Sequence, residues 1–144
     1  SKGSVKLSKE GEEFKLLIDH NFLSDSRDEK NIIEAVKKAR EVLLSKEFDE
    51  VRGKEIAPGN MVNTDEEILQ YIRKTALTVY HPVGTCKMGI DDLAVVSPKD
   101  LKVKGMNNLR VIDASIMPTI VSGNTSAPTM MIAEMGARMI LNKV

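Results

Sequence analysis

Residues 122–140 read SGNTSAPTMMIAEMGARMI, in which a glycine-bearing turn leads directly into a long apolar segment. From about Ser126 to Leu141 this segment has a polar residue suited to a cap, an early Pro128 and apolar residues on nearly every face. A helix that is apolar all round is typical of a protein interior. We therefore predict a buried C-terminal helix, whose methionines serve as adaptable core filler: Met130, Met131, Met135 and Met139.

The turn before this helix has two interpretations, because the first amide groups of a helix lack partners within the helix. In one interpretation Asn124 and Ser126 cap the helix, which is the commonest role for such residues at such a place. In the other, the positive helix end faces a developing negative charge on a ligand, as other helix N-termini do with phosphates. The sequence leaves both interpretations open.

Several short segments have the apolar alternation of strands. Residues 4–7 and 15–18 carry apolar side chains near period two and predict a strand pair. Residues 94–96, 101–103 and 109–112 predict three more short strands, separated by turns.

Two amphipathic helices are predicted between these strand regions. Ser26 and Glu29 stand in capping-box spacing and begin a helix that reaches about residue 45. Thr64 and Glu67 repeat the spacing and begin a second helix, which carries these apolar residues toward Tyr80: Ile68, Leu69, Ile72, Leu77 and Val79. Residues 46–63 have little periodicity and predict a loop.

The predicted fold class is α+β, with short, mostly antiparallel strands, two surface helices and one buried C-terminal helix. A length of 144 residues fits one domain over residues 1–144. The chain begins without Met on a strand-like segment, so we expect that Ser1 is not a native N-terminus.

The composition argues against several classes of partner. Lys and Arg number 21 and Asp and Glu number 21, so charge favours neither nucleic acid nor an anionic membrane surface. No apolar run approaches the roughly 20 residues of a membrane helix, and we expect a soluble chain. The single Cys86 cannot form an internal disulfide, and no zinc-type Cys/His spacing accompanies it. These features fit a reducing compartment, and we expect a cytoplasmic protein without a metal site.

The passage YHPVGTCKMG at residues 80–89 carries a candidate catalytic histidine. His81 lies beside a Pro and two Gly, so rigid turns can aim its imidazole. A loop-capping histidine is the alternative interpretation. A Cys86 nucleophile paired with His81 is disfavoured because no third orienting group can be identified. His20 stands among polar residues and is interpreted as a surface histidine.

Asp113 follows the LRVI strand pattern and precedes Ala114. Ligand contacts concentrate at strand ends in α/β proteins, but simple turn formation is common there as well. Both interpretations stay open.

Three passages together resemble the C-terminal signature of glucose-methanol-choline (GMC) oxidoreductases: YHPVGTCKMG at 80–89, VVSPKDLKVKGMNNLRVIDASIMP at 95–118 and SGNTSAPTMMIAEMGARMI at 122–140. The earlier SKGSVKLS resembles the SRGxVxL segment of the same family, with Lys2 replacing the usual Arg, and NFLSDSRDEK resembles its NYLxDPxD segment. Within the family the chain is most similar to the choline dehydrogenase and alcohol dehydrogenase branch, whose second catalytic position is Asn, here Asn124.

This resemblance implies oxidation of a small-molecule alcohol to an aldehyde or ketone, with hydride passing to N5 of FAD. It implies that His81 accepts or shares the hydroxyl proton and that Asn124 donates to the same oxygen without titrating. It implies that the helix beginning near Ser126 stabilises the reduced flavin. It also places Asp113 and Ala114 along the ribityl and pyrophosphate part of FAD, and it groups three residues around the isoalloxazine: Tyr80, Asn124 and Thr125.

The family's GxGxxG motif for the ADP moiety does not occur in these 144 residues. We therefore expect that an N-terminal FAD-binding domain outside this chain holds most of the cofactor, that the fragment alone is inactive, and that its uncovered surface favours self-association. Which alcohol is oxidised is left open. The alternative is a non-catalytic binding or assembly module that retains the fold.

Overall fold

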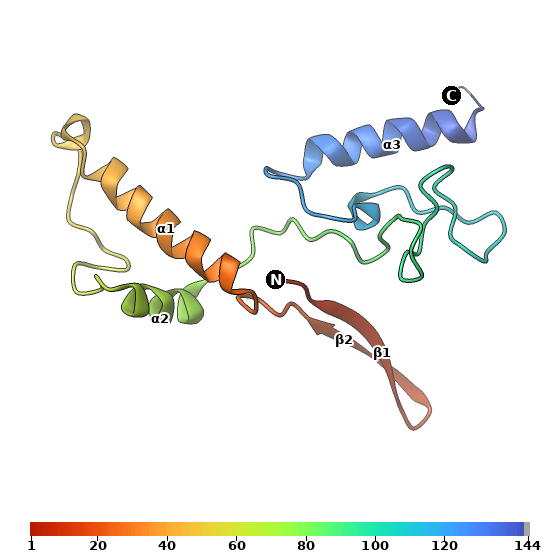
Figure 1. Cartoon of the computed structure of the whole chain (residues 1–144), viewed down its shortest axis with the longest axis horizontal. Coiled ribbons are helices and arrows are strands. Elements are labelled where there is room, and N and C mark those ends of the chain that lie inside the picture. The colour runs from red at the N-terminus through yellow and green to blue at the C-terminus, as the bar shows by residue number, and fades with distance from the viewer. Residues whose placement is uncertain (143–144) are drawn as a thin grey trace. The chain divides into compact units, whose positions relative to one another are not determined.

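The computed structural model describes residues 1–142, and the chain divides into two compact units, Ser1–Leu77 and Thr78–Val144 (Figure 1). Helices and a two-stranded antiparallel sheet occur along the chain, so the predicted α+β class is confirmed. The assignment of residues 1–144 to a single domain stays a prediction. Among the described helices, none combines the length and the apolar character needed to cross a membrane.

The first unit begins with the predicted strand pair. Strands β1 (Ser4–Glu10) and β2 (Glu13–Asp19) form an antiparallel hairpin whose turn uses Gly11 in the left-handed region, at φ 65°. Cross-strand partners share a face, so the pairs Val5 with Ile18 and Leu7 with Leu16 form one apolar face together with Phe14. Each of these five side chains is at least 48% exposed. The hairpin therefore presents an uncovered apolar face.

Helix α1 spans Ser26–Leu43 and confirms the first predicted helix, but its cap differs from the prediction. The N-cap is Asp25 rather than Ser26, because the Asp25 carboxylate accepts from the Arg27 backbone N–H at 2.9 Å and also pairs with the Arg27 guanidinium. That guanidinium holds the pKa of Asp25 well below its usual range. The side chain of Glu29 instead pairs with Arg73.

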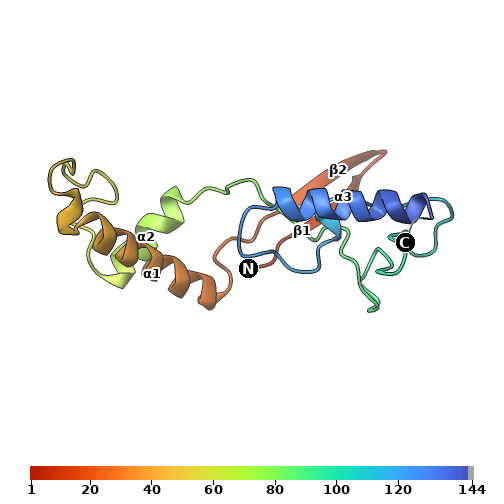
Figure 2. The same ribbon diagram turned by 90° about the horizontal axis from the view of Figure 1, so that it is seen from above.

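Helix α2 spans Asp65–Thr75 and has the predicted capping box between Thr64 and Glu67. It packs along α1, as Figures 1 and 2 show, and their shared core consists of buried aliphatic residues: Ile33, Ile68, Leu69 and Ile72. The prediction that α2 continues toward Tyr80 is wrong. The helix ends at Thr75, and Leu77 and Val79 beyond it are 86% and 77% exposed, so no buried face supports another turn. The predicted loop contains one short 3-10 helix, η1 (Lys46–Phe48).

The second unit is built mainly from irregular segments around a small core. The three strands predicted in residues 94–112 are wrong as continuous strands, since the structure has only isolated bridges there, Val96 with Val103 and Lys102 with Arg110 among them. The runs are too short for a ladder because turns interrupt them, including one at Gly105 with φ 74°. Their side chains still supply a core with the short helix η2 (Ala114–Ile116) and α3: Val96, Leu101, Ile116, Met117 and Ile132.

Helix α3 spans Ser126–Ile140 and confirms the existence of the C-terminal helix, but not its burial on every side. Only Ile132 and Gly136 are buried, whereas Met130 and Met131 are 63% and 57% exposed. The core of the second unit is small and covers one face of α3. The prediction that all four methionines fill a core is therefore wrong within the described chain, although Met139 does pack against it.

Gly136 sets how closely α3 approaches the rest of this unit. A Cβ placed at Gly136 would meet the Ile112 side chain, with Cδ1 only 2.8 Å away. A glycine inside a helix costs about 1 kcal/mol relative to alanine, so its presence here has a packing explanation.

We predict that Gly136→Ala destabilises the second unit by about 1–3 kcal/mol, because overpacking against Ile112 outweighs the gain in helix propensity. Urea unfolding followed by circular dichroism measures this change. Ala137→Gly, at the exposed neighbouring position, is the control for helix propensity alone. A Gly136→Ala variant more stable than wild type would contradict the close-packing explanation.

The capping box of α2 predicts a contribution to acid sensitivity in the first unit. Hydrogen bonds from the backbone amides of Thr64 and Asn63 to the Glu67 carboxylate, both 2.9 Å, lower its pKa from the ordinary 4.5. A lowered carboxyl pKa stabilises the fold above the ordinary value, and this contribution is lost as pH falls through the folded pKa. Glu67→Gln keeps the capping geometry without titrating.

We therefore expect the free energy of unfolding of wild type to decrease relative to that of Glu67→Gln as pH falls from about 7 to about 3. Urea unfolding at several pH values measures it. Glu12→Gln, in the exposed hairpin turn, is the matched control and should show a smaller shift. Equal pH dependence in the two variants would show that the capping carboxylate does not contribute.

Candidate active site

The segment carrying His81 is fixed by backbone contacts with the η2 region. The N–H of Cys86 donates to Ser115 O at 3.0 Å, and the N–H of Met88 donates to Ile116 O at 2.7 Å. Gly84 has φ 89°, and a Cβ there would lie 3.2 Å from Met117 O, so this turn requires glycine. His81 therefore lies in an irregular but anchored segment and not at the helix exit that the sequence predicted.

The structure brings His81 together with Thr125. The imidazole Nδ1 lies 2.9 Å from Thr125 Oγ1, across a sequence separation of 44 residues. His81 is half-buried, and Thr125 is 7% exposed, the one buried polar residue of the described chain. This contact leaves the second ring nitrogen, Nε2, for another partner.

The N-terminus of α3 does not show the capping that one of the two interpretations of this turn expected. The N-cap residue is Thr125, and its side chain makes no cap hydrogen bond, so the interpretation in which Asn124 and Ser126 cap the helix does not hold. Within residues 1–142, the amides of Ser126 and Ala127 donate no hydrogen bond, and Pro128 has no amide hydrogen to donate. Two N–H groups with partial positive charge thus lie next to the residue that holds His81.

Asn124 is exposed and directly precedes the buried Thr125. Its side chain makes no hydrogen bond to the described residues. Position along the chain therefore keeps the Asn124 backbone beside the residue that contacts His81. Its catalytic role stays a prediction.

Asp113 is the N-cap of η2, whose bounds include Ala114. Its carboxylate accepts from the Ser115 backbone N–H at 2.8 Å and from the Ser115 hydroxyl at 2.5 Å. Turn formation, one of the two interpretations of this residue, is thus observed. Asp113 is also exposed, while Ala114 is partly buried against the core, and their assignment to a cofactor stays a prediction.

Tyr80 has φ 62°, an uncommon conformation for a bulky residue, and its backbone N–H donates to Thr78 Oγ1 at 3.0 Å. Its side chain is 81% exposed. The local turn thus directs the phenol ring away from the core of this unit.

The alternative candidates are separated from this contact. Cys86 packs against the core of the second unit, and His81 is bonded to Thr125 rather than to this thiol. His20 is exposed and meets the edge of Phe22, with ring centroids 5.1 Å apart, which confirms its surface position.

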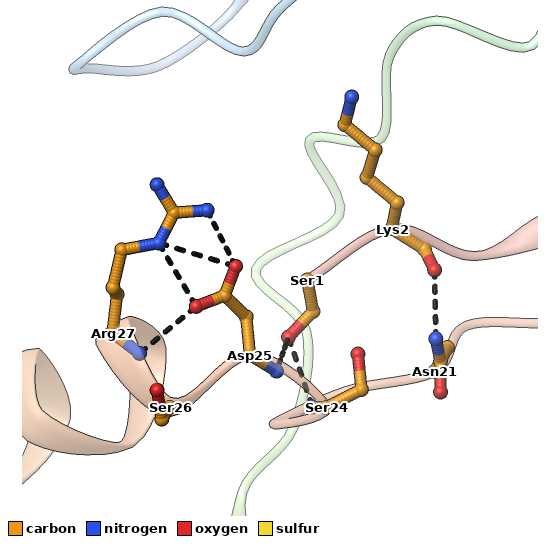
Figure 3. Close-up of a pocket in the computed structure, with 7 residues that line it drawn as sticks. All are labelled: Ser1, Lys2, Asn21, Ser24, Asp25, Ser26 and Arg27. Carbon is orange, nitrogen blue, oxygen red and sulfur yellow. Dashed lines mark hydrogen bonds and ion pairs between the residues drawn. The ribbon is translucent and has the colours of Figure 1, made fainter.

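A concave surface in the first unit contains none of the predicted site residues. It is drawn in Figure 3, where Arg27 pairs with Asp25, the Ser1 hydroxyl accepts from the Ser24 and Asp25 amides, and Asn21 donates to Lys2 O. These polar groups are satisfied by one another and serve to join the hairpin to the start of α1. The residues of this concave surface therefore have a structural role.

Sequence reasoning did not find the contact between His81 and Thr125. Thr125 was expected to lie near a cofactor, and no spacing signal links it to His81, because the two residues are 44 positions apart. The only usable signal is a threonine at a helix start, which ordinarily indicates a cap.

The comparisons with known proteins agree along most of the chain. The family model described as GMC oxidoreductase matches residues 1–133. An alcohol dehydrogenase (acceptor) from Pseudomonas putida is 50% identical over 128 residues, covering 89% of this chain and 23% of the relative. An oxygen-dependent choline dehydrogenase from Staphylococcus epidermidis is 46% identical over 142 residues, covering 97% of this chain and 25% of the relative.

Solved structures give the same result. A pyridoxine 4-oxidase from Mesorbium loti superposes with a TM-score of 0.87 at 36% identity, covering 97% of this chain and 27% of that protein. A fungal aryl-alcohol oxidase superposes with a TM-score of 0.82 at 31% identity, covering 98% and 23%. The chain thus spans about a quarter of the length of the curated relatives it matches.

Proposed function

Because this chain belongs to the GMC oxidoreductase family, we propose that it is the C-terminal, substrate-side domain of an FAD-dependent enzyme that oxidises an alcohol CH–OH group to an aldehyde or ketone. The observation that carries the proposal is the half-buried His81, held through Nδ1 by Thr125 next to two free amides at the start of α3. The imidazole of His81 and the positive N-terminus of α3 therefore lie next to each other.

In this proposal His81 takes the proton of the substrate hydroxyl at Nε2, because Nδ1 is occupied by Thr125. The exposed Asn124 amide donates to the same oxygen and stabilises the negative charge that develops on it. FAD, when bound, supplies the acceptor for the hydride that leaves the alcohol carbon. The chain's own residues therefore position the alcohol and move its proton.

The residues present fit the cofactor at its electron-rich end. Within the described residues the N–H groups of Ser126 and Ala127 have no partner, and the positive end of α3 stabilises negative charge placed beside them. We propose that Tyr80, Asn124 and Thr125 surround the isoalloxazine, a role that the outward direction of the Tyr80 side chain supports.

We also propose that Asp113 and Ala114 lie along the ribityl and pyrophosphate part of FAD. Exposure of Asp113 next to the packed Ala114 is consistent with a contact of this kind. Most of the cofactor is held elsewhere in this proposal, because the sequence lacks a dinucleotide-binding motif.

We also propose that another domain covers the exposed apolar surfaces of this chain. In the first unit the apolar hairpin face is uncovered, and in the second unit Met130 and Met131 leave one side of α3 exposed. Large uncovered apolar surfaces indicate an interaction partner. An N-terminal FAD-binding domain would cover them, and without it the fragment would be inactive and would self-associate.

We predict that His81→Ala in the flavin-loaded enzyme lowers kcat/KM by about 10²- to 10⁴-fold, because a positioned acid–base group is lost. Steady-state rates with the preferred alcohol measure the effect, and the flavin absorbance confirms unchanged cofactor content. His20→Ala replaces the other histidine and should leave the rate unchanged. A loss below about threefold for His81→Ala would reject the proton-transfer role.

We predict that Asn124→Asp slows flavin reduction while leaving thermal stability nearly unchanged. The side chain does not cap α3, so the fold does not depend on it, whereas an ionised carboxylate cannot donate to the substrate oxygen and would repel the forming alkoxide. Stopped-flow flavin bleaching and thermal unfolding are measured on the same variant.

Asn107→Asp makes the same chemical change at another exposed position and is the matched control. Bleaching at the wild-type rate in a normally folded Asn124→Asp variant would exclude the proposed donor role.

A further inference from the structure

We propose that Thr125 is a positioning residue, whose hydroxyl oxygen accepts from Nδ1–H of His81 and so leaves the lone pair on Nε2. This inference rests on the proposed function for the base role of Nε2. It gives Thr125 a task separate from contact with a cofactor: selecting the histidine tautomer and fixing the direction of the ring.

Thr125 is itself held in place from the helix side. Its carbonyl oxygen accepts from the Thr129 backbone N–H at 3.0 Å and from the Thr129 hydroxyl at 2.6 Å. The residue is 7% exposed, so little room is left for other side-chain orientations. The hydroxyl group therefore offers His81 a fixed partner.

The unused capping capacity of Thr125 permits its hydroxyl oxygen to accept from His81. A threonine at an N-cap usually accepts from an amide of the first helical turn, and here Oγ1 makes no such bond. Its lone pairs are thus available to an outside donor, and Nδ1 of His81 is the group within 2.9 Å. An Nδ1–H donor means that the neutral ring has its acceptor at Nε2.

The same bond serves both protonation states of the ring. Nδ1 carries hydrogen in the neutral tautomer proposed here and in the imidazolium formed once Nε2 has taken a proton. Thr125 Oγ1 can accept from it in both states, so proton transfer requires no rotation of the ring. The orienting partner of a catalytic histidine acts in this way when it holds one tautomer.

The test begins with ¹⁵N NMR of the histidine side chains in the flavin-loaded enzyme, in which the His81 signals are assigned as those that disappear in His81→Ala. The exposed His20 provides the reference ring. We expect a signal pattern for His81 with hydrogen on Nδ1. A wild-type spectrum with hydrogen on Nε2 of His81 would overturn the proposal.

Three substitutions separate positioning from folding. Thr125→Val removes the hydroxyl with little change in shape and should return His81 to the tautomer mixture of His20, whereas Thr125→Ser should keep the wild-type pattern. Thr119→Val makes the same chemical change at an exposed threonine of the same unit and is the matched control. An unchanged His81 spectrum in a folded Thr125→Val variant would overturn the proposal.

Kinetics in the flavin-loaded enzyme give the second measurement. Thr125→Val should lower kcat/KM by about 10- to 100-fold and change its pH profile, as expected when the partner of a working histidine is lost, and Thr125→Ser should restore both. Equal losses for the Val and Ser variants would contradict positioning by the hydroxyl. If His81→Ala is harmless, the proposed function fails whatever the NMR result. If His81→Ala is costly but Nε2 carries the hydrogen, only the inference about Thr125 fails.

Discussion

Close packing of α3 at Gly136 is the constraint on which the second unit depends. A side chain at this position would collide with Ile112, so only glycine lets the helix approach the core that Ile132 joins. The contact between Thr125 and His81 joins the start of α3 to the segment that carries His81. A helix interior thus accepts a residue with poor helix propensity because the packing of the whole unit requires it.

At the start of α3 the Thr125 side chain contacts a residue far away in the sequence and does not cap its own helix. Thr125 stands where a threonine usually satisfies a helix amide, but its hydroxyl contacts His81 instead. Two consequences follow at the same place: the imidazole is oriented, and the amides of Ser126 and Ala127 stay free. A helix start that is less well capped is thereby better suited to stabilise negative charge on a ligand.

Each unit of the chain leaves part of its apolar surface uncovered. The hairpin exposes the face that includes Leu7 and Phe14, and α3 exposes Met130 and Met131. An isolated two-stranded hairpin is only marginally stable in water, so such a face gains most from a covering partner. The chain spans about a quarter of the length of the curated relatives it matches.

The sequence by itself determined the α+β class, the hairpin, both surface helices, the capping box at Thr64 and the family, because each of these depends on local spacing or on contiguous motifs. It did not determine where α2 ends, which face of α3 is buried or which hydroxyl contacts His81. Those features depend on contacts between residues far apart in the chain, as the 44 positions between His81 and Thr125 illustrate. Only the tertiary structure decided them, because burial and hydrogen-bond partners are set by packing and not by local pattern.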